Sequence, residues 1–348
     1  MHGAHALLSA ATAVEALLTP DHRTLERAVS PHPALLPFEE SDRAAARVWV
    51  STHLPHLEAA ARTATAAGRH DLAWQLVDAM WPGLRLIPHH PMWVRVHREI
   101  GAPASRRDGA RAAERRMLLN WAAGLDNAED AIGLCGQVMA SAERDGDAHA
   151  RAEALRNQGV IEARSGDAVL ARSALLAAHR AHTAAGDELG AARADVGLGE
   201  LALNQDQHAG VLNRLCRARY VLIEAGDRLD AAIAQAHLSR VYHATGENGT
   251  GDDLLRGAAD AFAGEGCDLW RARCLERLGE LLHRRGRHQE GARLRQQTRD
   301  AFPGDGCVPW WCEPDTPGLQ SVVTPGADAA RGQHHPPSTW PYTSRTWI

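Results

Sequence analysis

The sequence predicts an all-α protein, an α-solenoid of repeated helical hairpins, and three observations support this prediction. A glycine-aspartate turn recurs every 40 residues between about 145 and 302. The apolar residues are mostly Ala, Leu and Val, and only 5% of residues are aromatic, a composition that favours closely packed helices. No alternating pattern is long enough for a sheet. At 348 residues the chain can form one continuous array of hairpins.

Residues 1–100 are expected to form a helical cap that precedes the array. Prolines interrupt the helical pattern in three segments and mark loops there. These segments are TPDHRT at 19–24, SPHPALLPFEESD at 30–42 and IPHHPMW at 87–93. The cap therefore consists of several short helices joined by loops.

The stretch GRHDLAWQLVDAMW at 68–81 is interpreted as one helix of this cap. Its polar stripe consists of Asp71, Gln75 and Asp78. The other positions from Leu72 to Trp81 are apolar, so the helix should be largely buried. Trp74 and Trp81 are then core residues rather than walls of a ligand site.

Four glycines spaced 40 residues apart divide the array, 101–302, into units. They are Gly146, Gly186, Gly226 and Gly266. Glycine can take the left-handed conformation that closes a helix, and the aspartate that follows can cap the next helix. Thirteen residues after each glycine comes a small residue, which predicts a close approach of two helix backbones. These small residues are Gly159, Gly199, Ser239 and Gly279. Residues 105–146 have a weaker signature and are interpreted as an earlier, degenerate hairpin.

This spacing resembles the tetratricopeptide repeat, although that family has a shorter period of about 34 residues. The resemblance is carried by ALRNQGVIEARSGD at 154–167, ADVGLGELALNQDQ at 194–207, AQAHLSRVYHATGE at 234–247 and CLERLGELLHRRGR at 274–287. The fourth segment is closest to the family pattern. The second has Asp206 where the others have glycine at the internal turn, so the bounds of that turn are left open.

The region before the array resembles the segment that joins the ATPase module to the tetratricopeptide array in actinobacterial NB-ARC regulators of the STAND class. The matching residues are Ala46, Val48, Trp49, His56, Leu57, His70, Leu72, Ala73, Trp74, Leu76, Ala79 and Trp81. The resemblance covers roughly 5–302. The chain contains no lysine, so it has no ordinary P-loop and nucleotide binding is not carried over. The resemblance implies a free-standing sensor or scaffold, or a truncated gene product.

Residues 303–348 differ in composition and are expected to form a disordered tail. They hold eight of the 17 prolines and four of the ten tryptophans, without apolar periodicity. Two alternatives are a shifted reading frame near the end of the array and a Trp-rich segment that docks on a partner.

Composition and motifs exclude several function classes. The net charge of −5 gives no general attraction to nucleic acid. The chain begins without a signal sequence, and no apolar run reaches the length of a membrane span, so a cytoplasmic protein is expected. The six cysteines form no CxxC, which predicts reduced, structural thiols. HExxH, GxSxG and a strand-linked GxGxxG are all missing, so we expect no enzyme, no metal and no cofactor.

The sequence therefore predicts a non-catalytic scaffold or regulatory module that binds a partner protein or acidic peptide through the concave face, in transcriptional or signalling regulation. Alternatives are a sensor of a small ligand or signal peptide, or a remnant of an NB-ARC regulator. Aligning the repeats projects these side chains inward: Glu153, Arg156, Arg164, Arg193, Glu200, Asn204, Arg240, His243, Arg273, Glu276, Glu280, His283 and Arg284. Arginine forks would receive carboxylates. An ordinary charged helix face with i, i+4 pairs is the alternative interpretation.

Overall fold

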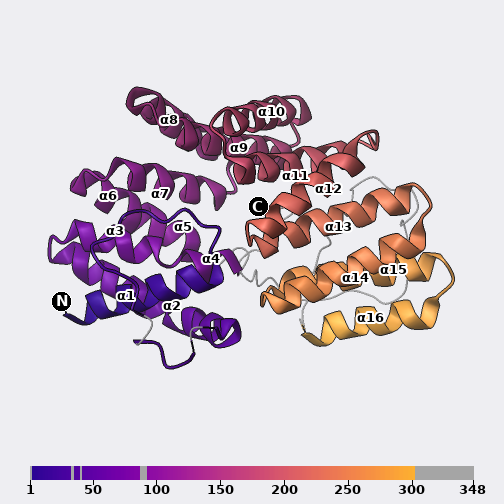
Figure 1. The fold of residues 1–348 in the computed structure, drawn as a ribbon, viewed down its shortest axis with the longest axis horizontal. Coiled ribbons are helices and arrows are strands. Elements are labelled where there is room, and N and C mark those ends of the chain that lie inside the picture. Colours follow the sequence, from indigo (N-terminus) through magenta and orange to yellow (C-terminus); the bar gives the residue numbers. More distant parts are fainter. Residues whose placement is uncertain (1, 33–34, 40, 87–91, 302–348) are drawn as a thin grey trace, which may run out of the picture.

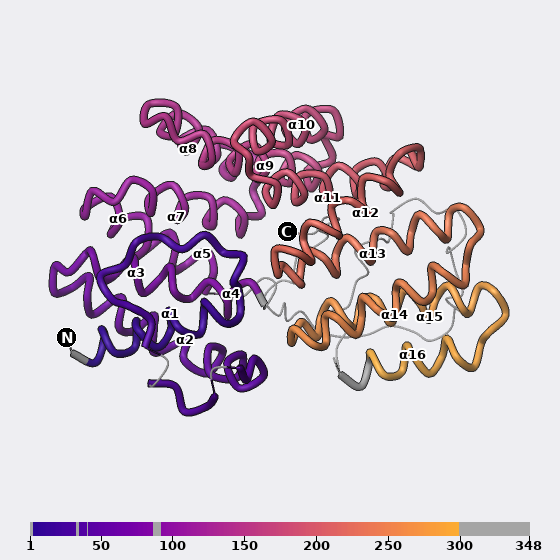
Figure 2. Tube along the Cα trace, in the orientation of Figure 1, coloured from indigo at the N-terminus to yellow at the C-terminus, as the bar shows by residue number. Residues whose placement is uncertain are grey.

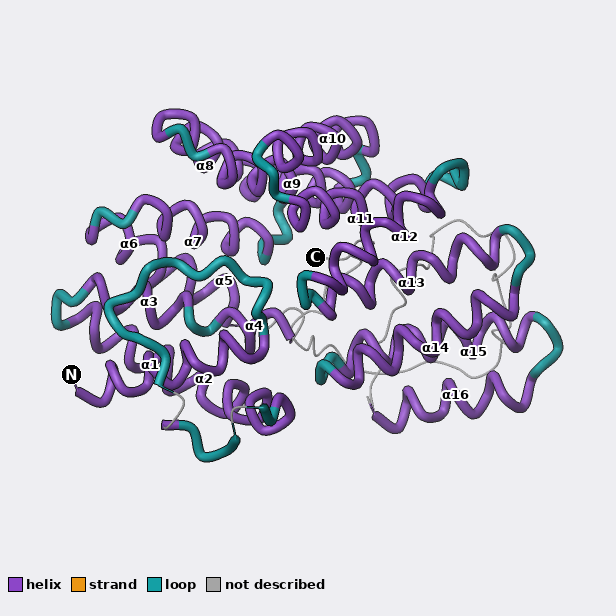
Figure 3. The backbone as a smooth tube through the Cα atoms, viewed as in Figure 1, coloured by secondary structure: helices purple, strands orange, loops and turns teal. Residues whose placement is uncertain are grey.

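The computed structural model describes residues 2–32, 35–39, 41–86 and 92–301, which form helices and loops without a strand (Figure 3). The prediction of an all-α solenoid is confirmed. The expected disordered tail, 303–348, lies outside the described residues. Among the described helices, none is both long enough and apolar enough to cross a membrane.

Short and medium helices form the N-terminal cap. They are α1 (His2–Leu18), α2 (Arg43–Ala66), α3 (His70–Asp78), α4 (Trp81–Leu86), α5 (Met92–Val96), the π-helix η2 (His97–Gly101) and α6 (Ala102–Asp108). One large apolar core joins these helices to the beginning of the array, with fully buried residues such as Leu54, Leu76 and Met117. The cap and the first hairpin therefore fold as one body.

The array continues as antiparallel hairpins, each packed on the next. Its helices are α7 (Arg111–Ala123), α8 (Ala128–Asp145), α9 (Ala148–Ser165), α10 (Ala168–Ala184), α11 (Glu188–Asn204), α12 (Val211–Glu224), α13 (Arg228–Ala244), α14 (Asn248–Gly264), α15 (Asp268–Arg284) and α16 (His288–Ala301). The stack curls, so that α13 to α16 lie across from the cap (Figures 1 and 2).

The predicted glycine turns are confirmed in all four units, and the predicted aspartate caps in three of them. In the fourth unit Cys267 is the N-cap of α15, without a side-chain cap bond. The four glycines at the 40-residue spacing all have positive φ, from 67° to 81°. Asp147, Asp187 and Asp227 each cap the following helix by accepting the backbone N–H three residues on. At the internal turn of the second unit, Asp206 takes the left-handed conformation itself, with φ 54°. The turn thus keeps its shape without glycine, at a conformational cost.

The segment 68–81 is not one helix, which corrects the sequence-based interpretation. Helix α3 ends at Asp78 and α4 begins at Trp81. Pro82 is the second residue of α4, and proline favours the start of a helix over its interior. Trp74 is buried, as expected, and its Nε1 donates to the Asp108 carboxylate at 2.7 Å. Trp81 is half-buried and stacks on the His22 ring at 4.9 Å.

Two of the three residues in the polar stripe of α3 face inward, whereas Asp71 is partly exposed and pairs with Arg69 at 2.7 Å. Gln75 and Asp78 are both buried. The Gln75 Oε1 accepts the Ala28 N–H at 2.8 Å, and Asp78 accepts from Arg27 at 2.7 Å. The loop between α1 and α2 therefore covers this stripe, and its polar groups are satisfied by that loop.

The described cysteines are unpaired thiols. Cys135, Cys267 and Cys274 are buried, and Cys216 is exposed. Burial raises the pKa of Cys135 and of Cys267 to about 12. The buried thiols thus remain protonated and pack as small apolar groups.

Ion pairs, rather than an apolar interface, join the cap to the third unit. Arg85 of α4 lies 2.9 Å from the Asp227 carboxylate, and Arg193 of α11 lies 2.6 Å from both Asp227 and Asp21. Asp230 is 3.0 Å from Arg193. These five residues are called the cap–array ion cluster. A separate bond joins Arg43 of α2 to Glu265 at 2.7 Å.

The cluster holds three carboxylates against two guanidinium groups, so one carboxylate is harder to ionise. Burial favours the neutral form of Asp227, but Arg85 and Arg193 outweigh it and hold the pKa of Asp227 well below its usual range. Burial, with the adjacent Asp227 charge, raises the pKa of Asp230 to about 6. Asp230 therefore keeps a proton in the folded state at pH values where it ionises in the unfolded chain.

Replacing Asp230 with asparagine should flatten the pH dependence of stability. Wild-type Asp230 has a folded pKa near 6 and an unfolded pKa of about 3.9. The folded state thus binds more protons between these values, and its free energy of unfolding falls as pH rises through this window, by about 1 to 2 kcal/mol. Urea unfolding of Asp230→Asn from pH 4 to 7 should lack this fall. Asp253→Asn, an 81% exposed carboxylate, is the control, and identical curves for Asp230→Asn and wild type would contradict the assignment.

Small residues let helices cross closely, as the crossing between α15 and α16 shows. A Cβ on Gly279 would lie 2.8 Å from the Gly291 carbonyl oxygen, and a Cβ on Gly291 would lie 2.4 Å from that of Gly279. The corresponding Cβ on Gly159 or Gly199 would meet leucine side chains at 2.6 Å. Backbone contacts backbone at the α15–α16 crossing, so this neighbour cannot move aside as a side chain can.

Gly279→Ala, and more strongly Gly279→Leu, should destabilise the protein. The added group overpacks the α15–α16 crossing, at a cost of about 1 to 3 kcal/mol. Gly133→Ala is the matched control: this glycine is exposed on α8 and a Cβ there meets nothing within 4 Å. The control should gain up to about 1 kcal/mol from helix propensity. Thermal unfolding followed by circular dichroism measures the melting temperature of each variant. A melting temperature of Gly279→Leu equal to that of wild type would refute the close backbone contact between α15 and α16.

Candidate functional site

The first helix of each hairpin lies on the inner side of the curved stack. The first helices α7, α9, α11 and α13 contact one another directly from unit to unit. Neighbouring helices in a curved stack come closest along its inner side. The face formed by α9, α11, α13 and α15 is therefore the concave face, where the sequence predicts a partner site.

A first notch opens on this face between α9 and α11. It is lined by Val160, Ala163, Leu175, Gly197, Glu200, Leu201 and Asn204. Most of this lining is apolar, and Glu200 and Asn204 supply its polar groups. Such a surface suits an aliphatic side chain better than a charged group.

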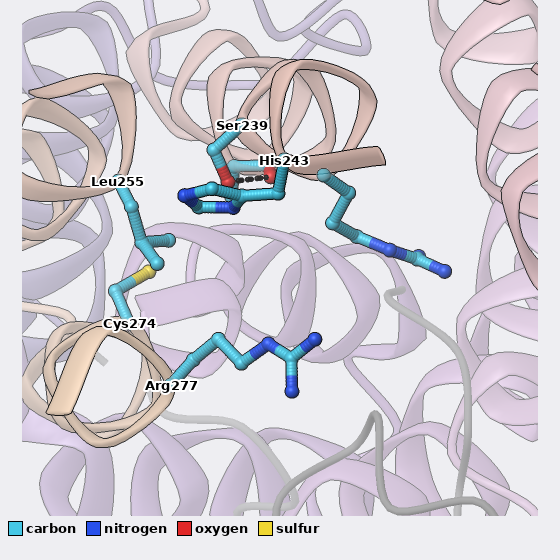
Figure 4. Close-up of a pocket in the computed structure, with 7 residues that line it drawn as sticks. Ser239, His243, Leu255, Cys274 and Arg277 are labelled. Atoms are coloured by element: carbon cyan, nitrogen blue, oxygen red, sulfur yellow. Dashed lines mark hydrogen bonds between the residues drawn. The ribbon is translucent and has the colours of Figure 1, made fainter. Parts of the chain in front are cut away.

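A second notch opens between α13 and α15, at the equivalent place two units later. It is lined by Ala236, Ser239, Arg240, His243, Leu255, Cys274 and Arg277. His243 and Arg277 reach this notch from α13 and α15, as Figure 4 shows. Four positions correspond at a spacing of 80 residues: Val160 with Arg240, Ala163 with His243, Leu175 with Leu255, and Gly197 with Arg277. The same junction is thus apolar in one place and cationic in the other.

The junction between these two, from α11 to α13, is filled by His237. This residue occupies the position of Gly197 and Arg277 and is fully buried. Its Nε2 lies 3.8 Å from the Glu200 carboxylate. Burial, strengthened by nearby Arg240, lowers the pKa of His237 well below its usual value, so the ring is neutral.

Hydrogen bonds hold the side chains of the cationic notch in place. Arg240 Nη2 donates to Asn204 Oδ1 at 2.8 Å, and Arg277 Nη1 donates to Glu280 at 3.1 Å. His243 Nε2 lies 3.0 Å from the Asp252 carboxylate, and burial lowers the pKa of this histidine. At neutral pH the positive charge of the notch therefore comes from Arg240 and Arg277.

Two of the expected inward-facing arginines serve the fold. Arg164 donates to the carbonyls of Ala123 and Leu125 at 3.2 and 3.1 Å, and so satisfies acceptors at the end of α7. Arg193 belongs to the cap–array ion cluster, where neighbouring carboxylates hold its pKa above its usual value in spite of burial. These contacts correct the expectation that both residues present their charge to a groove.

The remaining expected residues lie apart from the cationic notch or at its edge. Arg156 pairs with Glu153 at 3.0 Å, and Glu200 is buried beside His237. Arg273 lies over the Trp270 ring, 4.5 Å from its centre. The others lie on α15: Glu276 is half-buried, Glu280 bonds Arg277 and Arg284, and His283 is 3.1 Å from His288.

Of the expected set, Asn204, Arg240 and His243 come together at or beside the cationic notch. Sequence reasoning missed Arg277, which completes it. The signal was present, because Arg277 follows Arg273 by four residues and so shares its helix face. Arginine forks and neutral donors of this kind suit an anion, in particular a carboxylate.

The fold and site define a helical-repeat protein with a cationic notch on its concave face. No protein-family model matches the chain, and no curated protein matches it. Conclusions about its function therefore depend on the geometry of the repeats and of the notch.

Proposed function

We propose that this protein is a non-catalytic interaction module that binds an acidic peptide segment, or the C-terminal carboxylate, of a partner protein along its concave face. The observation that carries the proposal is the notch between α13 and α15, where Arg240 and Arg277 approach from adjacent units. Two guanidinium groups on neighbouring helices can bind one carboxylate with paired hydrogen bonds. The apolar notch between α9 and α11 would receive an aliphatic side chain of the same peptide.

The size of the notches favours a peptide over an enclosed small molecule. Each notch has room for about one water molecule and opens to solvent. Small-molecule sites usually bury most of their ligand in several hundred Å³. A peptide that lies across the groove needs only shallow notches for alternate side chains, so the scaffold interpretation is preferred to that of a small-ligand sensor.

The proposed class is the tetratricopeptide repeat, with six extra residues in each unit. The hairpins repeat as that class requires, and 274–287 is the segment that follows its pattern best. By the same resemblance, the proposed biological role is regulatory, with this protein recruiting or sensing a partner as the repeat region of an NB-ARC regulator does. Catalysis has no part in this proposal.

Reversal of the notch charges should weaken peptide binding. Fluorescence anisotropy with a library of acidic peptides should show salt-sensitive binding. Amidation of the C-terminus should weaken it where the terminal carboxylate is the group bound, and leave it unchanged where an internal acidic side chain is bound. Arg240→Glu and Arg277→Glu should each lower the affinity by about 10- to 100-fold, the usual value of a charge-assisted hydrogen bond. Arg180→Glu, an exposed arginine on α10, should leave the affinity nearly unchanged.

The melting temperatures of these variants separate lost binding from lost folding. Both notch arginines are half-buried, and we expect a change of only a few degrees. Equal affinities of Arg240→Glu, Arg277→Glu and wild type for a bound peptide would remove the notch from the recognition surface. Unchanged affinity in high salt would equally count against a carboxylate ligand.

A further inference from the structure

Three potential metal ligands meet at the turn between α10 and α11, away from both notches. His149 lies in the first turn of α9, His182 in the last turn of α10, and Asp187 at the N-cap of α11. Both imidazole Nδ1 atoms lie 2.9 Å from the same carboxylate oxygen, Asp187 Oδ2. Within the described part of the chain, this is the one group of three or more His, Cys, Asp or Glu side chains close enough to hold an ion.

The carboxylate of Asp187 is fixed before any ion binds. Its Oδ1 accepts the Gly190 N–H at 2.8 Å, which leaves Oδ2 toward the two imidazoles. The same oxygen, Oδ2, therefore faces Nδ1 of both imidazoles.

The imidazole of His182 is placed by a small residue and an acid. The ring is fully buried, and a Cβ on Gly190 would lie 2.2 Å from its Nδ1, so only glycine at 190 allows this position. On the other side of the ring, Nε2 lies 3.6 Å from Glu153 Oε1. In the neutral tautomer with hydrogen on Nε2, Nδ1 can bind a metal while Nε2–H points toward Glu153. Metal-binding histidines commonly donate the N–H of their other ring nitrogen to a carboxylate.

We propose that His149 Nδ1, His182 Nδ1 and Asp187 Oδ2 bind one divalent transition-metal ion of the zinc type. Two imidazoles and one carboxylate are a usual ligand set for zinc, nickel and cobalt. The three ligand atoms lie within 4.8 Å of one another, and bonds of about 2.0 to 2.2 Å require only small rotations of the rings. His149 is one-third exposed, so an ion can enter and a water can complete the coordination.

The site would connect two repeat units. His149 and His182 belong to the first and second helix of one hairpin, and Asp187 caps the first helix of the next. A bound ion would add a bond across this boundary and stiffen the junction between the two units. The proposal is independent of peptide binding, because neither notch contains these ligands.

Titration with the metal alone tests the site. Untagged full-length protein, freed of metal with a chelator, is titrated calorimetrically with Zn²⁺, and Co²⁺ provides an absorption spectrum that reports coordination by nitrogen and oxygen. We expect one ion per chain with a micromolar or lower Kd, and a melting temperature that rises by several degrees in saturating Zn²⁺. Wild-type protein that binds no ion in the micromolar range would overturn the proposal.

Two variants locate the ion. His149→Ala and Asp187→Asn should each weaken binding by more than about 10-fold; asparagine also caps helices, so Asp187→Asn should retain the fold. His288→Ala is the matched control, because it breaks another close imidazole pair, with His283 at 3.1 Å, and should bind Zn²⁺ as wild type does. Unchanged binding in His149→Ala and Asp187→Asn would place the ion elsewhere and refute the site.

Discussion

The cap–array ion cluster is the constraint on which the shape of the protein depends. Its five charges are largely withdrawn from water, and each guanidinium contacts carboxylates from separate elements. Taking charges out of water is costly, and removing one partner leaves another uncompensated. Asp227 also caps α13, so one carboxylate both begins that helix and binds the cap. The position of the cap relative to the third unit therefore follows from a few directional bonds, and these fix the curvature of the concave face.

Divergence of a few repeat positions gives the concave face its local chemistry, and one of them shows this in every unit. The position eleven residues after each turn glycine is Asn157, Gly197, His237 and Arg277 in successive units. Glycine leaves an apolar hollow, histidine fills the junction, and arginine makes it cationic. Val160 and Ala163 of the first notch are likewise replaced by Arg240 and His243 in the second, so a few side chains decide what each junction can bind. A repeat array can thus present an ordered series of unlike notches without altering its fold.

Local signals predicted the array, because each hairpin is closed by contacts between residues near in sequence. The turn glycines appear as expected, the capping aspartates appear in three of the four units, and Asp206 shows that the turn can form without glycine. The end of α3 before Trp81 was not predicted, although Pro82 indicates that a new helix begins there. The site was predicted only in part. Projecting residues onto a helix face shows which way each side chain points, but it does not show which residues of other helices that side chain contacts. Stacking and curling of the array bring Asp21 near Arg193 and His149 near His182. These contacts cannot be read from the local spacing of residues in the sequence.

The contacts that close the curl join residues far apart in the chain, with 172 positions between Asp21 and Arg193 and 222 between Arg43 and Glu265. During synthesis the cap leaves the ribosome first, and its charged partners follow only after several hairpins have been made. The hairpins, whose contacts are local, can form as they emerge. The polar side of the cap stays hydrated until Glu265 is available, which keeps the unfinished chain soluble where an apolar surface would invite aggregation. The contacts that close the curl therefore cannot all form until the chain has been made as far as Glu265.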